Sequence, residues 1–331
     1  MRVGTITFDT AQGIANIALA FHKAGLVQRA MVFRHRAYAN LDRWPHDVRY
    51  QPTEVDQFLQ GLDALLLVET DLTHDWMLSR LAKQRGVKVV LIPMYEYTQF
   101  PPPVRPDLVI CPSALDYDYW SPTYDCVQLP LPVEQSWRLR ERALEFVHNA
   151  GHGQHDYAKG TVQVIDALQH VQAPIKLRIR AQLDDGKMRR LYEQHRHHPR
   201  LEWELDVPPE RLYAVGDVFI NTEKFNGCSL PLQEAWASGM CVVTTDRYPA
   251  NTWLPPEPLI PVKEYVRYRI PGGSGIEFDK AVVDPVDVAR VIDGLYGEDI
   301  SRFSLAGRDY AAAHSWETLK PRYTRAIEEA L

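Results

Sequence analysis

Residues 217–246 read DVFINTEKFNGCSLPLQEAWASGMCVVTTD, in which an apolar run, a polar loop, a helical segment and a second apolar run follow one another. The two apolar runs, VFI and CVV, have the length of buried parallel strands. Between them, Ser229 stands at the position of a helix N-cap, Pro231 falls in the first turn, and Gly239 follows the last helical residue. The stretch therefore predicts a strand-loop-helix-strand unit of an open α/β sheet, around which the rest of the chain can be placed.

The loop of this unit carries polar side chains at the carboxyl end of its first strand. Ligands of open α/β sheets bind at such loops, and a helix N-terminus there can hold an anion or a polar group. The candidate binding residues of the stretch are Thr222, Asn226, Gly227, Ser229, Leu230 and Glu234. The alternative is an ordinary buried unit whose helix is capped and which binds nothing.

From Asn226 onward the sequence resembles the donor-binding segment of retaining GT-B glycosyltransferases of family four, whose usual form is E-G-F-G-L-P-x-x-E-A-x-A-x-G-x-P-V-V-A-T. In that family two glutamates eight positions apart hold the nucleotide sugar, the first at the sugar hydroxyls and the second at the ribose hydroxyls. Glu234 matches the second glutamate, and Asn226 takes the place of the first. An amide donates and accepts hydrogen bonds but carries no charge, so sugar binding is still expected while the identity of the sugar stays open.

Length and composition agree with a two-domain enzyme. The chain has 331 residues, of which 45% are hydrophobic and 24% charged, as in ordinary soluble globular proteins. Its formal net charge of −6 provides no global attraction to nucleic acid or to an anionic membrane. The four cysteines have no CxxC spacing, and neither a signal peptide nor a long apolar span is evident, which favours a reducing, cytoplasmic location.

The chain opens with a strand at 2–8, the loop DTAQG and an amphipathic helix at about 14–23. A single glycine, Gly13, is weak evidence for a dinucleotide site and is closer to the first loop of a GT-B amino-terminal domain. In that interpretation the residues facing an interdomain cleft are Asp9, Thr10, Gln12 and Gly13, with Asp9 a catalytic candidate. A simple turn, with Asp9 and Thr10 capping the helix, is the alternative.

Further strands are predicted at 30–33, 64–68, 87–92 and 108–111, with helices between them such as 75–84. This alternation predicts a parallel sheet covered on both faces. Glu69 and Glu96 follow two of these strands at their carboxyl ends, where ligands of such sheets bind. Many family members have a histidine after the strand that here ends in LIPMYEYTQF.

This chain has Glu96 and Tyr97 in that region instead. A carboxylate such as Glu96 could position or deprotonate an acceptor hydroxyl, with Glu69 and Tyr97 beside it, and a solvated loop residue is the equally open alternative.

A second alternation of strands and helices starts near Leu144, after a proline-rich linker at 130–132. Its first strand, 145–148, leads into a polar glycine loop. The candidate donor-binding residues there are His148, Asn149, Gly151, His152 and Lys159. The resemblance implies a Gly-Arg pair and a Lys-Gly pair for the donor diphosphate. Lys159-Gly160 matches the second pair, whereas Gly153 is followed by Gln154 where the arginine is expected; a lysine with glycine-loop N–H groups can still neutralise phosphate.

Two other interpretations compete at basic or histidine-rich segments. His148, His152, His155 and Asp156 could be metal ligands, but their spacing matches no standard zinc pattern, so no metal is predicted. The run KMRRLYEQHRHHPR, 187–200, could contact nucleic acid, but such a run is more often the solvated face of a helix.

Near the end of the chain, YPANTW at 248–253 departs from the family's Gly-Gly-x-x-E pattern. By contrast, 284–296 and the Ser-Trp-Glu at 315–317 resemble its last two helices.

Together these features predict two doubly wound Rossmann-like domains facing each other across a cleft: 1–132 on the acceptor side, 133–310 on the donor side, and a helix at 311–331 crossing back to the first domain. The expected activity is transfer of a hexosyl or pentosyl group from a UDP- or GDP-sugar to a hydroxyl, with catalytic candidates Glu96, Asp9 and Asn226. Retention of configuration is implied by the resemblance alone, and no metal or prosthetic group is required.

A glycan or small-molecule acceptor is preferred, and a hydroxymethylated base in DNA is the alternative acceptor. A non-catalytic nucleotide-sugar or glycan-binding protein of the same fold is the alternative function.

Overall fold

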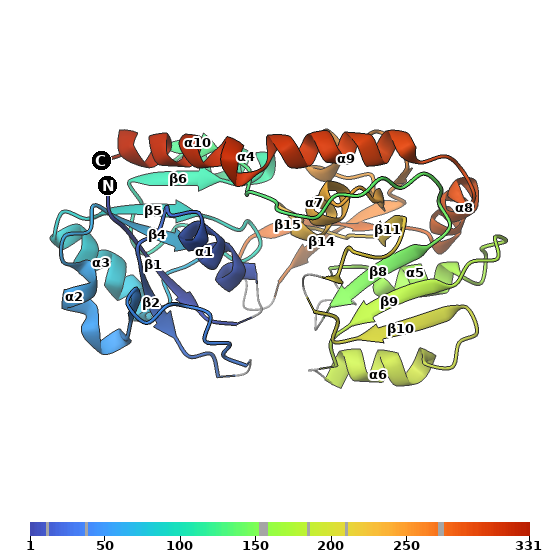
Figure 1. Cartoon of the computed structure of the whole chain (residues 1–331), viewed down its shortest axis with the longest axis horizontal. Coiled ribbons are helices and arrows are strands. Elements are labelled where there is room, and N and C mark those ends of the chain that lie inside the picture. Colours follow the sequence, from blue (N-terminus) through green and yellow to red (C-terminus); the bar gives the residue numbers. More distant parts are fainter. Residues whose placement is uncertain (11–12, 37–38, 152–157, 184–185, 209–210, 271–274) are drawn as a thin grey trace. The chain divides into compact units, whose positions relative to one another are not determined.

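The computed structural model describes residues 1–10, 13–36, 39–151, 158–183, 186–208, 211–270 and 275–331 (Figure 1). The chain divides into two compact units. Unit 1 comprises Met1–Pro132, Arg269–Ile276 and Trp316–Leu331, and unit 2 comprises Val133–Tyr268 and Glu277–Ser315. Within the described residues, no helix combines the length and the apolar character that crossing a membrane requires.

The strands are β1 (Val3–Phe8), β2 (Arg29–Phe33), β3 (Arg49–Tyr50), β4 (Ala64–Val68), β5 (Lys88–Ile92), β6 (Leu108–Cys111), β7 (Cys126–Gln128), β8 (Phe146–Gly151), β9 (Leu177–Ala181), β10 (Leu201–Leu205), β11 (Val218–Asn221), β12 (Cys241–Thr245), β13 (Leu259–Ile260), β14 (Glu264–Arg269) and β15 (Glu277–Val282). The α-helices are α1 (Gly13–Lys23), α2 (Val55–Leu59), α3 (Met77–Gln84), α4 (Ala114–Trp120), α5 (Thr161–Ala167), α6 (Gly186–His195), α7 (Leu230–Ala237), α8 (Pro285–Leu295), α9 (Ser301–Ala313) and α10 (Trp316–Glu329). Short 3-10 turns are η1 (Pro52–Glu54), η2 (His74–Trp76) and η4 (Ala250–Thr252).

Unit 1 is built on a parallel sheet with strand order β3-β2-β1-β4-β5-β6-β7. Its central strand β4, ALLLV, is fully buried, as expected for a parallel strand covered on both faces. The order reverses beside β1, which creates a topological switch point at the carboxyl ends of β1 and β4. Helix α10 belongs to this unit, since Trp316 and Tyr323 both pack edge-on against Phe21 of α1, with ring centroids 5.0 Å away.

Unit 2 is built on a second parallel sheet, with order β10-β9-β8-β11-β12-β13, and carries a separate two-stranded sheet, β14-β15. The core between the larger sheet and α5 and α8 is aliphatic, while the opposite face packs on Trp236 and Leu232 of α7. The prediction of two doubly wound, Rossmann-like domains is confirmed.

Local predictions differ from the structure in three places. Strand β8 extends to Gly151 and not only to His148, so Asn149 and Gly151 lie in the strand and not in the loop after it. The helix expected at 75–84 is divided into η2 and α3 because Trp76 has a left-handed backbone, φ 53°. The exposed strand β14 was missed because EYVRYR lacks the apolar pattern of a buried strand.

Candidate active site

The centre of the loop between β11 and α7 is a buried ion pair. Strands β8, β11 and β12 are parallel neighbours, so their carboxyl ends meet at one edge of the sheet. There Glu223 and Arg247 form an ion pair of 2.8 Å, and both side chains are almost completely buried. Burial raises the pKa of Glu223 above its usual value, and the Arg247 guanidinium opposes part of this rise. The pair therefore keeps a charge in the protein interior, where an unpaired carboxylate would be strongly unfavourable.

Glu223 also holds the two polar residues of the loop. Its Oε1 accepts hydrogen bonds from Asn226 Nδ2 at 3.1 Å and from Ser229 Oγ at 3.0 Å. Asn226 Oδ1 accepts the backbone N–H groups of Cys228 and Ser229. Most of the hydrogen-bonding capacity of Asn226 is thus used inside the loop, and only one amide hydrogen remains for a ligand.

Ser229 holds the N-cap position of α7 as predicted, but its side chain makes no capping bond. Its backbone is left-handed, φ 48°, which turns its hydroxyl toward Glu223 instead of the helix. Asn226 takes over the task of accepting loop N–H groups. Pro231 lies in the first turn as predicted, and the N–H of Leu230 has no partner among the described residues.

Arg247 organises the same loop from the β12 side. Its Nε and Nη atoms donate to the carbonyl oxygens of Glu223, Asn226 and Tyr248 in addition to the Glu223 carboxylate. All five guanidinium hydrogens are therefore engaged, so Arg247 supports the loop. It does not replace the family's arginine, whose position Gln154 takes in this chain.

Lys159 approaches this loop from the end of β8. A side chain at Gly151 would collide with Lys159 Nζ, and one at Gly160 would collide with the backbone oxygen of Thr222. The turn before α5, which contains Lys159 and Gly160, is also joined to the loop after β11 by the hydrogen bond from Thr222 Oγ1 to the Gly160 oxygen at 2.8 Å. The two glycines thus let the lysine lie close against the backbone at the strand ends.

The electrostatics of Lys159 link it to two carboxylates. Burial lowers its pKa, and the charges of Glu223 and Glu234 raise it. No partner for the ammonium group lies within ion-pair distance among the described residues. A lysine in this state is a ready site for an anion, which would relieve the cost of its desolvation.

Glu234, on the first turn of α7, is held by a tyrosine. The Tyr213 hydroxyl donates to Glu234 Oε2 at 2.8 Å. Burial raises the pKa of Glu234, while the bond from Tyr213 and the charge of Lys159 lower it. Its Oε1 has no partner among the described residues and can accept hydrogen bonds from a ligand.

His148 was expected to bind the donor, and the structure gives its ring a different environment. Its Nδ1 donates to the Ile220 carbonyl at 2.7 Å, which makes Nε2 the acceptor of the Thr161 hydroxyl at 2.8 Å. The ring is completely buried between β8, β11 and α5. Both nitrogens are therefore used in holding the strands and the helix together, and neither is left to coordinate a metal.

The amino-terminal candidates lie in unit 1. Asp9 is buried and ion-paired with Arg43, whose Nε and backbone N–H donate to the carboxylate at 2.9 and 2.6 Å. Arg43 also donates to the Thr10 carbonyl, while Gly13 begins α1 and is exposed. Asp9 thus fixes the segment around Arg43 at the carboxyl end of β1.

Three carboxylates gather at the carboxyl ends of β4, β5 and β6. Burial and the charge of Glu96 raise the pKa of Glu69 to about 7. The same two causes raise the pKa of Asp116 to about 8, opposed by a hydrogen bond from Ser113. Glu96 is buried, whereas the neighbouring Tyr97 is half-buried in the same loop. The interpretation of Glu96 as a solvated loop residue is wrong, because its side chain is only 6% exposed.

Other predicted residues lie outside the described part of the chain: Gln12, His152, Gly153, Gln154, His155 and Asp156. Among the residues that are described, no group of three His, Cys, Asp or Glu side chains could hold a metal ion. In the basic run, Arg200 turns inward and donates to the carbonyl oxygens of Leu168 and Val171, while Met188 and Leu191 of α6 are buried. This run is an amphipathic helix followed by a structural arginine.

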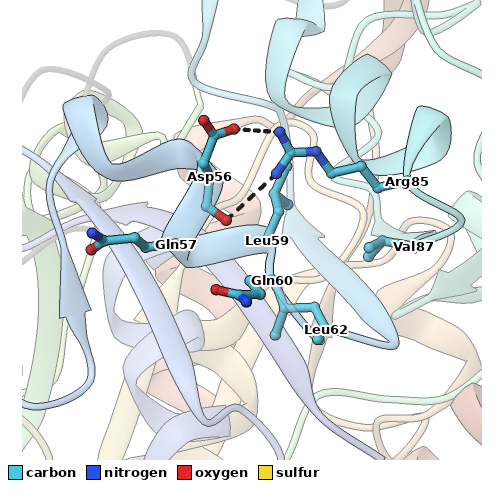
Figure 2. Close-up of a pocket in the computed structure, with 8 residues that line it drawn as sticks. Asp56, Gln57, Leu59, Gln60, Leu62, Arg85 and Val87 are labelled. Atoms are coloured by element: carbon cyan, nitrogen blue, oxygen red, sulfur yellow. Dashed lines mark hydrogen bonds and ion pairs between the residues drawn. The ribbon is translucent and has the colours of Figure 1, made fainter.

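A pocket of about 470 Å³ lies elsewhere in unit 1 (Figure 2). It is lined by α2 and the turns before β4 and β5, and the ion-paired Asp56 and Arg85 are part of its lining. These turns lie at the amino ends of the strands, the edge opposite to that where open α/β sheets bind their ligands. The pocket is therefore separate from the candidate site.

Four residues of these clusters were not identified from the sequence: Glu223, Arg247, Tyr213 and Asp116. Glu223 stands two positions beyond a buried strand, much as Glu69 directly follows one, and this position was the only local signal for it. The others are recognisable only through their partners in the folded chain.

Comparison with known proteins places the fold. No protein-family model and no curated protein matches the sequence. Solved structures do match. A sucrose-phosphate synthase from Thermosynechococcus elongatus has a TM-score of 0.67 at 14% identity, covering 99% of both chains. The lipopolysaccharide outer core galactosyltransferase WaaB has a TM-score of 0.62 at 13% identity, covering 100% of both.

The pneumococcal O-GlcNAc transferase GtfA, solved with UDP and GlcNAc, has a TM-score of 0.59 at 13% identity. The match covers 83% of this chain and spans 59% of the length of GtfA. All three are glycosyltransferases of the GT-B fold, and at these identities the likeness establishes the fold. The chain therefore has two Rossmann-like domains of GT-B type.

Proposed function

We propose that this protein transfers a glycosyl group from a nucleoside diphosphate sugar to a hydroxyl acceptor. The observation that carries the proposal is that Lys159 and Glu234 lie within electrostatic range of each other at the carboxyl edge of the second sheet, each with hydrogen-bonding capacity left for a ligand. A cation for a diphosphate and a carboxylate oxygen for a diol, a few residues from a helix N-terminus, match the two ends of such a donor. The fold shared with glycosyltransferases agrees with this assignment.

In this scheme Lys159 meets the negative charge that develops on the departing diphosphate, and the N–H of Leu230 adds a helix-terminal donor. Oε1 of Glu234 accepts the ribose hydroxyls. The remaining amide hydrogen of Asn226, held in place by Glu223, is the group that contacts the sugar. Gly227 and Thr222 shape the floor of the same site, and Asn149 supports it from β8.

The acceptor side is assigned to unit 1. Glu96 is proposed as the group that orients or deprotonates the acceptor hydroxyl, with Glu69 and Tyr97 next to it in sequence or space. Asp9 and the Thr10 carbonyl, both bonded to Arg43, stabilise the first loop, and Gly13 follows them at the start of α1. Because the pKa of Glu69 is near neutrality, this cluster can hold and release a proton in the physiological range.

Finer features follow the resemblance to family four. They are a UDP- or GDP-linked hexose or pentose as donor, retention of configuration, and catalysis in the cytoplasm without a metal ion. A glycan or small-molecule acceptor is favoured over DNA, because the basic run forms a helix with a buried face and the net charge is −6.

The test is a donor screen by mass spectrometry with UDP- and GDP-sugars, followed by calorimetry on two variants. Lys159→Ala should weaken binding of the nucleoside diphosphate by about 10- to 100-fold and that of the free nucleoside by less than about threefold. Glu234→Ala should weaken both ligands, since both contain ribose. Lys176→Ala, an exposed lysine of the same unit, is the control and should change neither.

Equal losses for diphosphate and nucleoside in Lys159→Ala would remove the lysine from the phosphate site. Binding of a nucleotide sugar without any transfer or slow hydrolysis would instead identify a binding protein of the same fold.

A further inference from the structure

Tyr213 is buried in unit 2 between β10 and β11, with 4% of its surface exposed. Its ring packs edge-on against Phe219 at 5.9 Å, on the sheet face that α7 covers. Its hydroxyl donates to Oε2 of Glu234 at 2.8 Å. It is therefore the only described side chain that a hydrogen bond joins to this carboxylate.

The backbone around Tyr213 is fixed by two buried arginines. Arg140 donates through Nη2 to the Tyr213 carbonyl at 2.8 Å and through Nε to the Gly216 carbonyl at 2.9 Å. Arg180 donates to the carbonyl oxygens of Leu212 and Val215. Each arginine is only 2% exposed. A guanidinium buried to this extent has few alternative positions, so the segment is held firmly on both sides of the tyrosine.

The direction of the Tyr213 hydroxyl is also determined. The hydroxyl donates its hydrogen bond to Glu234, while the side chain of Asn149 lowers the pKa of the phenol. The bond from Tyr213 engages Oε2 of Glu234 and leaves Oε1 open.

We infer that Tyr213 is a positioning residue that holds the carboxylate of Glu234 in place, and through it sets the preference of the site for ribonucleoside over deoxyribonucleoside diphosphates. The inference rests on the proposed function, in which Glu234 accepts the ribose hydroxyls. A fixed carboxylate oxygen has two lone pairs and can accept both hydroxyls of a ribose. A site built around a hydroxyl discriminates strongly against the ligand that lacks it, because its polar group is left unpaired.

The experiment measures UDP and 2′-deoxy-UDP binding to the full chain by calorimetry, with GDP and 2′-deoxy-GDP in parallel. For the pair that binds, the wild type should prefer the ribonucleotide by about 10-fold or more. In Tyr213→Phe, the affinity for the ribonucleotide should fall by about 10-fold and the preference should shrink to about threefold or less. The loss is selective because the deoxynucleotide makes little use of the contact that the mutation weakens.

A matched control is the tyrosine that hydrogen-bonds to Gln233, the residue before Glu234 in α7. The hydroxyl of Tyr310, a half-buried tyrosine of α9, donates to Gln233 Oε1 at 2.8 Å, the same length as the bond from Tyr213 to Glu234. Tyr310→Phe removes an equivalent hydroxyl without touching Glu234, and should keep the wild-type preference. Thermal melting of both variants establishes that they are folded.

A second readout is pH. The hydrogen bond from Tyr213 lowers the pKa of Glu234, so its removal should shift the acidic limb of ribonucleotide binding to higher pH. A purely structural role would weaken both nucleotides equally at every pH.

If Tyr213→Phe keeps the full preference and the same pH profile, the inference is overturned while the proposed function stands. If the wild type does not distinguish the two nucleotides, Glu234 does not bind the ribose, and both fail.

Discussion

Replacing Arg247 by methionine removes the cation from a carboxylate that folding has already taken out of water. Glu223 is 2% exposed and would keep only the bonds from Asn226 and Ser229. The carbonyl oxygens of Glu223, Asn226 and Tyr248 would also lose the hydrogen bonds that Arg247 donates to them. Removal of one partner of a buried ion pair costs about 3–5 kcal/mol, so Arg247→Met should lower the free energy of unfolding of unit 2 by about that amount.

The loss should depend on pH, and its sign follows from the pKa. Burial already raises the pKa of Glu223 above that of an unfolded glutamate, and loss of Arg247 raises it further. The folded variant then binds a proton that the unfolded chain releases, so its stability falls as pH rises from about 5 toward 8. The deficit relative to wild type should therefore be smaller at pH 5 than at pH 8.

The assay is urea unfolding of the full chain, with amide hydrogen exchange of peptides from 218–247 reporting unit 2. The control is Arg267→Met, which breaks a 3.0 Å pair with Asp279 that is largely exposed to solvent. The control should cost less than about 1 kcal/mol. A loss in Arg247→Met no larger than in the control, or one that does not vary with pH, would refute the reasoning.

Three further outcomes are expected. Gly160→Ala should destabilise the protein by at least about 2 kcal/mol, because φ is 66° and the new methyl group would meet the Thr222 backbone. Gly294→Ala, at a position of α8 with open space around it, should be neutral or slightly stabilising, and chemical denaturation measures both. Asp116→Asn should flatten the fall of melting temperature between about pH 4 and pH 8, since a carboxyl whose pKa is raised from 3.8 to about 8 loses its contribution over that range; an unchanged slope contradicts this. Chelator treatment should leave donor turnover intact, and loss of activity that zinc restores would show a metal requirement.

The larger elements were predictable because their signals are local. In 217–246, two short apolar runs, a proline in the first turn and a glycine after the helix predict β11, α7 and β12, and the structure has them there. Gly239 adopts φ 91°, a conformation that disfavours other residues. Lys159 and Glu234 were chosen from the resemblance of their segments to family four, and the structure brings them within electrostatic range of each other.

The sequence left the partners of the charged residues undetermined. The chain has 37 basic and 43 acidic residues, and nothing in their order indicates that Arg247 meets Glu223, 24 positions away, or that Tyr213 meets Glu234. The backbone of Ser229 is left-handed, and its N–H and hydroxyl bond to Asn226 and Glu223, so the side chain does not cap α7 as its local preference would suggest.

The spacing of apolar residues thus predicts strands and helices from residues close in sequence. It therefore also predicts the domains and the loops at the strand ends. Which side chains become buried together at those loops depends on how parallel strands align, and the cost of an unpaired buried charge then selects the pairs.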